Sequence, residues 1–174
     1  TVIQIEGNDI FLWPWTNTKS NKESSSGSIN LLFYGKTKSQ MESYMTNTAL
    51  NQFHTGFGWD EYGNRGSGSG TLSWTQTGMF SQLEYGSYTT TRYHLILLDG
   101  LYSSSLGKNW CYGQVHHEYW SDSDINHYIY PNGFDAGRAF VDGAIQGSIP
   151  RNYVNMQNYQ WGFADGYGLR YIMA

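Results

Sequence analysis

The stretch Thr89–Asp99, TTTRYHLILLD, decides the fold, because its side chains alternate with a period of two. Such alternation is typical of a β-strand, in which successive side chains lie on opposite faces of the sheet. One face would carry Arg92, His94, Ile96 and Leu98, and the other Tyr93, Leu95 and Leu97. We therefore predict a strand with one partly polar face and one apolar face.

This strand has candidate neighbours further along the chain. Asn109–Trp120 (NWCYGQVHHEYW) follows the loop Gly100–Lys108 and would pair with Thr89–Asp99. A third strand is predicted at Ile125–Tyr130, where the turn-forming sequence Pro131-Asn132-Gly133 ends it. Together these segments predict the centre of a mostly antiparallel sheet.

Other segments would extend this sheet. Ile29–Tyr34 is an apolar run without strict alternation, which favours a strand buried on both faces. Short strands are also expected at Val2–Ile5, Ile10–Trp13 and Thr71–Thr75. Gln160–Met173 alternates aromatic residues with glycine, and we expect it to form an edge strand.

Two helices are predicted beside the strands. Thr37 is a favourable N-cap and Gln40 completes a capping box. Asp135 would cap a second helix that runs to about Gln146 and stops at Gly147. The first helix has one apolar stripe at helical period: Met41, Tyr44, Met45, Thr48 and Ala49.

The order of these elements predicts the fold class. Strands and helices do not alternate as βαβ units, so the chain is expected to be α+β. We predict a mostly antiparallel twisted sheet with two helices packed on it. A length of 174 residues fits a single domain over residues 1–174.

Composition excludes several functional classes. Aromatic residues make up 17% and charged residues 14%, against about 25% charged in an average domain, so disorder is excluded. The net charge is −4 and there is no run of Lys and Arg, so we expect no nucleic-acid partner. No apolar run approaches the roughly 20 residues of a transmembrane segment. The single cysteine, Cys111, rules out an intrachain disulfide and CxxC-type sites.

Histidines provide the main candidate for chemistry. In one predicted strand, His116 and Glu118 share a face, whereas His117 lies on the other. His127 or His94 from a neighbouring strand would join them. If the protein is an enzyme, its catalytic residues are therefore expected to be His94, His116, Glu118 and His127.

The same residues suggest a divalent metal. A transition-metal site needs about three such ligands at ~2.0–2.2 Å with one open position, and His116, Glu118 and His127 are the candidates. A His-x-Glu pair on a strand is a weak signal compared with a helical HExxH motif. The favoured alternative is a set of histidines that hydrogen-bond within a polar, aromatic-rich sheet face, with no cofactor.

A second polar pair lies at the predicted start of the second helix. Asp135 and Arg138 are spaced as an N-cap and an i,i+3 ion pair. Alternatively, Arg92 beside His94 would receive Asp135 and tie this helix to the sheet.

The aromatic residues suggest a binding function. The chain has 15 Tyr, 8 Phe and 7 Trp, more than one small core needs. Some would form stacking platforms for sugars or anchors of a protein interface; most would pack in the core or pair across strands. The candidates for binding are Trp13, Trp15, Trp59, Trp120 and Trp161.

An ordered set of short motifs over about residues 27–146 resembles the LssY C-terminal domain family. The segments are Gly27–Leu31 before the helix at Thr37, Arg92–Leu97, Trp110–Gly113, and Asn126–Pro131 with Asp135 and Arg138. Leu95-Ile96 and Gly137 depart from the family pattern. The resemblance implies an accessory α+β module, with residues 1–15 and 160–173 as extensions. It also implies a polar cluster of Arg92, His94, His127, Asp135 and Arg138, but no activity.

These observations favour a non-catalytic module that acts by binding or self-association through aromatic surfaces and strand edges. Its partner would be another copy, a cell surface or a carbohydrate. The alternatives are a metal-assisted or acid–base hydrolase and a carbohydrate-binding module. A surface rich in Ser, Thr, Asn and Tyr, and a chain that begins at Thr1, favour an extracellular or cell-surface location.

Overall fold

The computed structural model describes the backbone of residues 2–5, 8–11, 29–45, 59–61, 80–86, 89–98, 102–103, 108–159 and 163–173. Side chains are described for residues 29–45, 89–97, 109–156 and 163–173. Within these ranges, no helix is long and apolar enough to cross a membrane.

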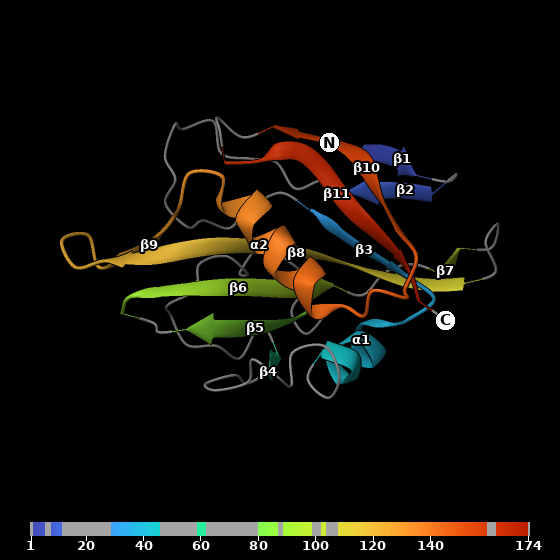
Figure 1. Cartoon of the computed structure of the whole chain (residues 1–174), viewed down its shortest axis with the longest axis horizontal. Coiled ribbons are helices and arrows are strands. Elements are labelled where there is room, and N and C mark those ends of the chain that lie inside the picture. The colour runs from blue at the N-terminus through green and yellow to red at the C-terminus, as the bar shows by residue number, and fades with distance from the viewer. Residues whose placement is uncertain are drawn as a thin grey trace.

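A mixed, mostly antiparallel sheet forms the centre of the described structure (Figure 1). Its main path runs in the order β10-β11-β3-β8-β6-β5-β4, and β7 and β9 also pair with β8. Of the described strand pairs, only β11 and β3 are parallel. The strands are β3 (Leu31–Tyr34), β4 (Trp59–Glu61), β5 (Phe80–Gly86), β6 (Thr91–Leu98), β7 (Tyr102–Ser103), β8 (Lys108–Ser121), β9 (Asn126–Ile129), β10 (Arg151–Tyr159) and β11 (Asp165–Ile172).

Two helices and a separate hairpin accompany this sheet. The helices are α1 (Lys38–Tyr44) and α2 (Gly133–Ala144), and the hairpin pairs β1 (Val2–Ile5) with β2 (Asn8–Phe11). Both helices contribute to one buried cluster on one face of the sheet, where Met41 and Val141 meet Leu95 and Val115. This arrangement confirms the predicted α+β single domain with two helices packed on a mostly antiparallel sheet.

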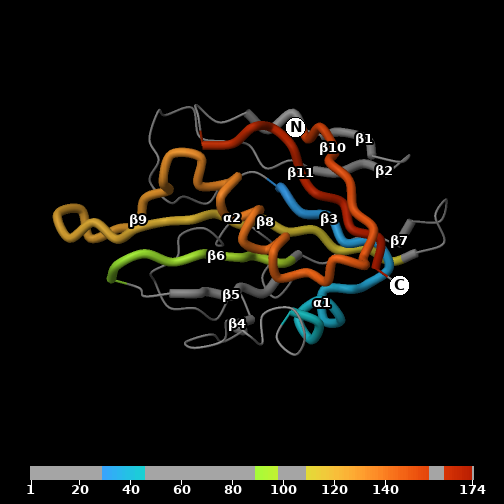
Figure 2. The backbone as a smooth tube through the Cα atoms, in the orientation of Figure 1, coloured from blue at the N-terminus to red at the C-terminus, as the bar shows by residue number. Residues whose placement is uncertain are grey.

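The long strand β8 lies in the middle of the sheet (Figure 2). On one side it pairs with β6 over its middle part, and on the other side it pairs first with β3 and then with β9. In the gap between β3 and β9, the side-chain amide of Asn30 makes the hydrogen bonds to β8 that a neighbouring strand would otherwise make. Its Oδ1 accepts from the Val115 backbone N–H at 3.0 Å, and its Nδ2 donates to the Val115 carbonyl at 2.9 Å. These two hydrogen bonds satisfy the backbone N–H and carbonyl of Val115, the residue immediately before His116.

Glycine allows α2 to approach β8 closely. A Cβ at Gly137 would lie 2.8 Å from the His116 Cα, closer than real Cβ contacts. The helix backbone therefore rests on the strand backbone at His116.

The predicted helix starts differ in their outcome. The capping box of Thr37 and Gln40 is confirmed, with both hydrogen bonds present. The prediction that Asp135 caps the second helix is wrong, because α2 already begins at Gly133, after Asn132 at a φ of 55°. Asp135 lies in the first turn, where its carboxylate accepts from the backbone N–H of Asp165. A long-range contact therefore replaces the local cap.

The prediction for the C-terminal strand is also wrong in position. β11 starts at Asp165 and lies inside the sheet between β10 and β3, so it is not an edge. Among the described strands, this end of the sheet is formed by β10, whose polar sequence RNYVNMQNY was not recognised as a strand. An edge strand needs no continuous apolar face, which explains why the pattern was missed. The expected strand at Thr71–Thr75 lies outside the described residues.

Candidate metal centre

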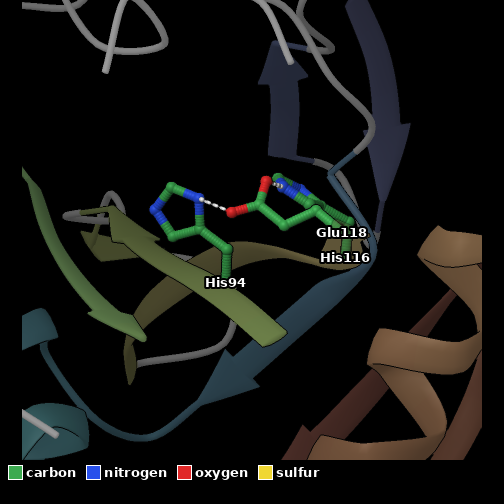
Figure 3. A group of neighbouring side chains, drawn as sticks. All are labelled: His94, His116 and Glu118. Atoms are coloured by element: carbon green, nitrogen blue, oxygen red, sulfur yellow. Dashed lines mark hydrogen bonds and ion pairs between the residues drawn. The ribbon is translucent and has the colours of Figure 1, made fainter. Parts of the chain in front are cut away.

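Strand pairing brings four polar residues together on the sheet face opposite the apolar cluster beneath the helices. In the register of β6 and β8, His94 lies directly across from His116, and Arg92 from Glu118. Their neighbours Leu95 and Val115 belong to the core under the helices, so alternation places this polar set on the other face. Figure 3 shows His94 and His116 on either side of the Glu118 carboxylate.

The carboxylate of Glu118 connects the set. Its Oε2 lies 2.7 Å from His116 Nε2, and its Oε1 lies 3.6 Å from His94 Nδ1. Arg92 Nε donates a hydrogen bond to the same Oε1. One potential metal-ligand atom from each of His94, His116 and Glu118 lies within 4.8 Å of the other two.

The group is inaccessible to solvent. His94 and Glu118 are 0% exposed, and His116 is 1% exposed. Burial alone would raise the pKa of Glu118, but the charge and hydrogen bonds of His116 and His94 hold that pKa well below its ordinary value. Glu118 is therefore an ionised carboxylate inside the protein, and an ionised carboxylate only accepts hydrogen bonds.

The buried Nδ1 of His116 lacks a hydrogen-bond partner among the described residues. His116 donates through Nε2 to Glu118, which leaves its buried Nδ1 unsatisfied. A buried polar atom without a partner costs free energy, about 1–3 kcal/mol. Such a cost is typical of sites that are completed by another group.

His117 lies on the opposite face, as strand alternation requires. Its ring stacks on Tyr93 at 4.3 Å and contacts Tyr130 at 4.4 Å, and its Nε2 lies 2.8 Å from Thr91 Oγ1. Burial, with a contribution from His116, lowers the pKa of His117. His117 is therefore a neutral member of an aromatic stack and is separated from Glu118 by the sheet.

His127 does not belong to the group of three ligand atoms. It lies on β9 across from Trp120, is 2% exposed, and places its ring 4.9 Å from the Trp120 ring. Of the metal candidates predicted from sequence, the structure thus joins His116 and Glu118, and His94 occupies the place expected for His127.

The polar cluster implied by the resemblance is divided between two places. Arg92 and His94 lie at the Glu118 site, whereas Arg138 forms two hydrogen bonds with the Asp165 carboxylate, at 2.7 and 2.6 Å. These hydrogen bonds, outweighing partial burial, lower the pKa of Asp165. Asp135 lies 3.7 Å from Arg138 and binds the backbone of Asp165, so this second group joins α2 to β11. Sequence reasoning missed Asp165, because only the tertiary structure brings it to the helix.

Most of the predicted binding tryptophans cannot be placed. The side chains of Trp13, Trp15, Trp59 and Trp161 lie outside those the structure describes. Trp120 is half-buried, and its Nε1 donates to Asp122 at 2.8 Å.

Comparisons with known proteins identified no similar protein. No protein-family model, curated protein or solved structure matches the chain.

Proposed function

We propose that the protein is a metal-binding domain that holds one divalent transition-metal ion of the zinc class at His94, His116 and Glu118. The observation that supports this proposal is the convergence of three ligand atoms within 4.8 Å in a buried site. In a tetrahedral site with metal–ligand bonds of about 2.0–2.2 Å, the ligand atoms lie about 3.3–3.6 Å apart, so a bound ion would draw these side chains closer together.

The donor set favours a transition metal over calcium or magnesium. Two imidazole nitrogens and one carboxylate oxygen suit Zn²⁺ and its first-row neighbours, whereas Ca²⁺ and Mg²⁺ prefer oxygen ligands alone. Arg92 would position the carboxylate, since its hydrogen bond to Oε1 leaves Oε2 directed toward His116.

The location favours a structural role for this ion. His94 lies on β6, and His116 and Glu118 lie on β8, so a shared ion would link the two strands. Ligands that are 0–1% exposed offer a substrate no direct approach, which disfavours the hydrolase alternative. The ion would also replace the short contact between His116 and Glu118 with two metal–ligand bonds.

Metal titration of chelator-treated protein tests this function. We expect one equivalent of Zn²⁺ to bind and to raise the unfolding temperature, and we expect His94→Ala and Glu118→Ala to abolish binding. His117→Ala is the matched control, because His117 lies on the other face and should leave binding unchanged. Absence of tight binding in the wild type, or equal binding by His94→Ala, would refute the proposal.

A second candidate function, self-association, is favoured by the sheet edge. β10 ends the strand order, and Tyr153 on β10 and Tyr167 on β11 are 61% and 42% exposed. We propose that β10 pairs with β10 of a second copy, since two-fold antiparallel pairing is self-complementary. Sedimentation of the wild type over a range of concentrations tests this. A wild type that stays monomeric at high concentration would contradict it.

A further inference from the structure

Two exposed tyrosines lie close together on β10 and β11. Tyr153 on β10 is 61% exposed, and Tyr167 on β11 is 42% exposed. In the register of these strands, Tyr153 lies directly across from Leu169. Tyr167 precedes Leu169 by two residues on β11, so the two tyrosines are diagonal neighbours on one face, within reach of each other's aromatic side chains. Leu169 belongs to the core cluster under the helices, which places both tyrosines on the helix side of the sheet, next to α2 (Figure 1).

The side chain of Arg138, on α2, connects the two tyrosines. It is buried, and its Cζ lies 5.1 Å from the centre of the Tyr153 ring. Its Nη1 donates to the Tyr167 carbonyl at 2.6 Å and to Asp165 Oδ1 at 2.7 Å, and its Nη2 donates to Asp165 Oδ2 at 2.6 Å. Because one planar guanidinium contacts both strands, the tyrosines and Asp165 are held in fixed relative positions before a ligand binds.

The polar groups beside the tyrosines carry no excess positive charge. The Asp165 side chain is 42% exposed, and a carboxylate has about four acceptor sites, so it can accept a further hydrogen bond from a ligand. Asp135 lies 3.7 Å from Arg138, so two carboxylates surround one guanidinium. Phosphate and sulfate groups are bound by clusters of positive charge, which this surface lacks. The surface therefore fits an uncharged ligand that carries hydroxyl groups.

A sugar ring has this chemistry, because its C–H groups form an apolar face and its hydroxyl groups surround that face. Tyrosine provides a large, rigid and amphipathic contact surface at a low cost in conformational entropy. We propose that Tyr153, Tyr167 and Asp165 form a binding surface for neutral carbohydrate chains, in which sugar rings stack on the tyrosines and a hydroxyl group donates to the Asp165 carboxylate. Pairing of the β10 edge with a second copy would use backbone groups in the plane of the sheet and leave this face available.

A protein partner matches this surface less well than a carbohydrate. The residues that dominate protein interfaces are surrounded by further contacts that exclude water. Among the described side chains, Ile125 is the only other large apolar one that is exposed, and it lies in the turn before β9. The two tyrosines therefore have no apolar surround of the kind that such an interface needs.

Affinity gel electrophoresis tests this surface. Native gels would contain hydroxyethyl cellulose, arabinoxylan, glucomannan or soluble starch as neutral polysaccharides, and heparin as an anionic one. We expect at least one neutral polysaccharide to retard the wild type and heparin not to. Tyr153→Ala and Tyr167→Ala should each weaken that binding by about fivefold or more, whereas Tyr153→Phe should retain it because the ring remains. Ile125→Ala is the matched control, since it removes an exposed apolar side chain elsewhere.

Several results would overturn the inference. They are a wild type that none of the neutral polysaccharides retards, retardation by heparin alone, and a loss in Ile125→Ala equal to that in the tyrosine variants. Sedimentation of the same variants without polysaccharide tests the protein alternative. If Tyr153→Ala dissociated a wild-type oligomer and left polysaccharide binding unchanged, the surface would belong to a contact with a second copy. All gels contain a chelator, so their outcome is independent of the proposed metal centre.

Discussion

Replacing Glu118 with glutamine should destabilise the protein severely even without metal. The substitution keeps the shape of the side chain but removes the negative charge that faces Arg92, and the side chains of these residues are 0% and 3% exposed. A buried ion pair that loses one partner costs about 3–5 kcal/mol, because the remaining charge stays buried without compensation. For a chain of 174 residues this corresponds to a fall in unfolding temperature of about 6–20 °C.

The assay is urea unfolding in the presence of a chelator, so that metal binding does not contribute. Arg92→Met and the double variant Arg92→Met/Glu118→Gln complete a double-mutant cycle. We expect the double variant to lose less stability than the sum of the single variants, since it removes both charges of the ion pair together. Additive losses, or a Glu118→Gln variant within about 1 kcal/mol of the wild type, would refute this description of the site.

Four further predictions concern acid stability, two glycines of α2 and the support of β8. The lowered pKa of Glu118 means that its contribution is complete above about pH 4.5 and is lost as the pH falls through the folded-state pKa, so acid unfolding monitored by circular dichroism should become less pH-dependent in Glu118→Gln. Gly137→Ala should lower stability by about 1–3 kcal/mol because the new Cβ would collide with β8. Gly143→Ala, where the Cβ meets nothing within 4 Å, should raise stability by up to about 1 kcal/mol in the same urea assay. Asn30→Ala removes two hydrogen bonds to Val115 and should lower both stability and metal affinity; unchanged values would contradict its role in closing the ladder.

The sequence predicts features that depend on local patterns. A period of two places Arg92 and His94 on one face of β6, and the same rule separates His116 from His117. The capping box of α1 also depends only on residues three apart. Such features need no knowledge of which strands become neighbours.

Features that depend on strand register could not be predicted in this way. Both His94 and His127 lie on strands next to β8, and only the register places His94 across from His116 and His127 across from Trp120. A shift of one residue would have reversed the faces of either strand.

Contacts between residues that are far apart in the chain could not be predicted from local sequence patterns either. Asp135 has the spacing of a helix cap, but it accepts from the backbone of Asp165 on β11. Arg138 likewise pairs mainly with Asp165, which lies 27 residues further along the chain.

Anomalous X-ray diffraction at the zinc absorption edge, from crystals of the chelator-treated protein reloaded with one equivalent of Zn²⁺, tests the central claim most directly. We predict a single strong peak at about 2.0–2.2 Å from ligand atoms of His94, His116 and Glu118. A peak elsewhere on the protein, or no peak between these three side chains, would contradict the metal centre.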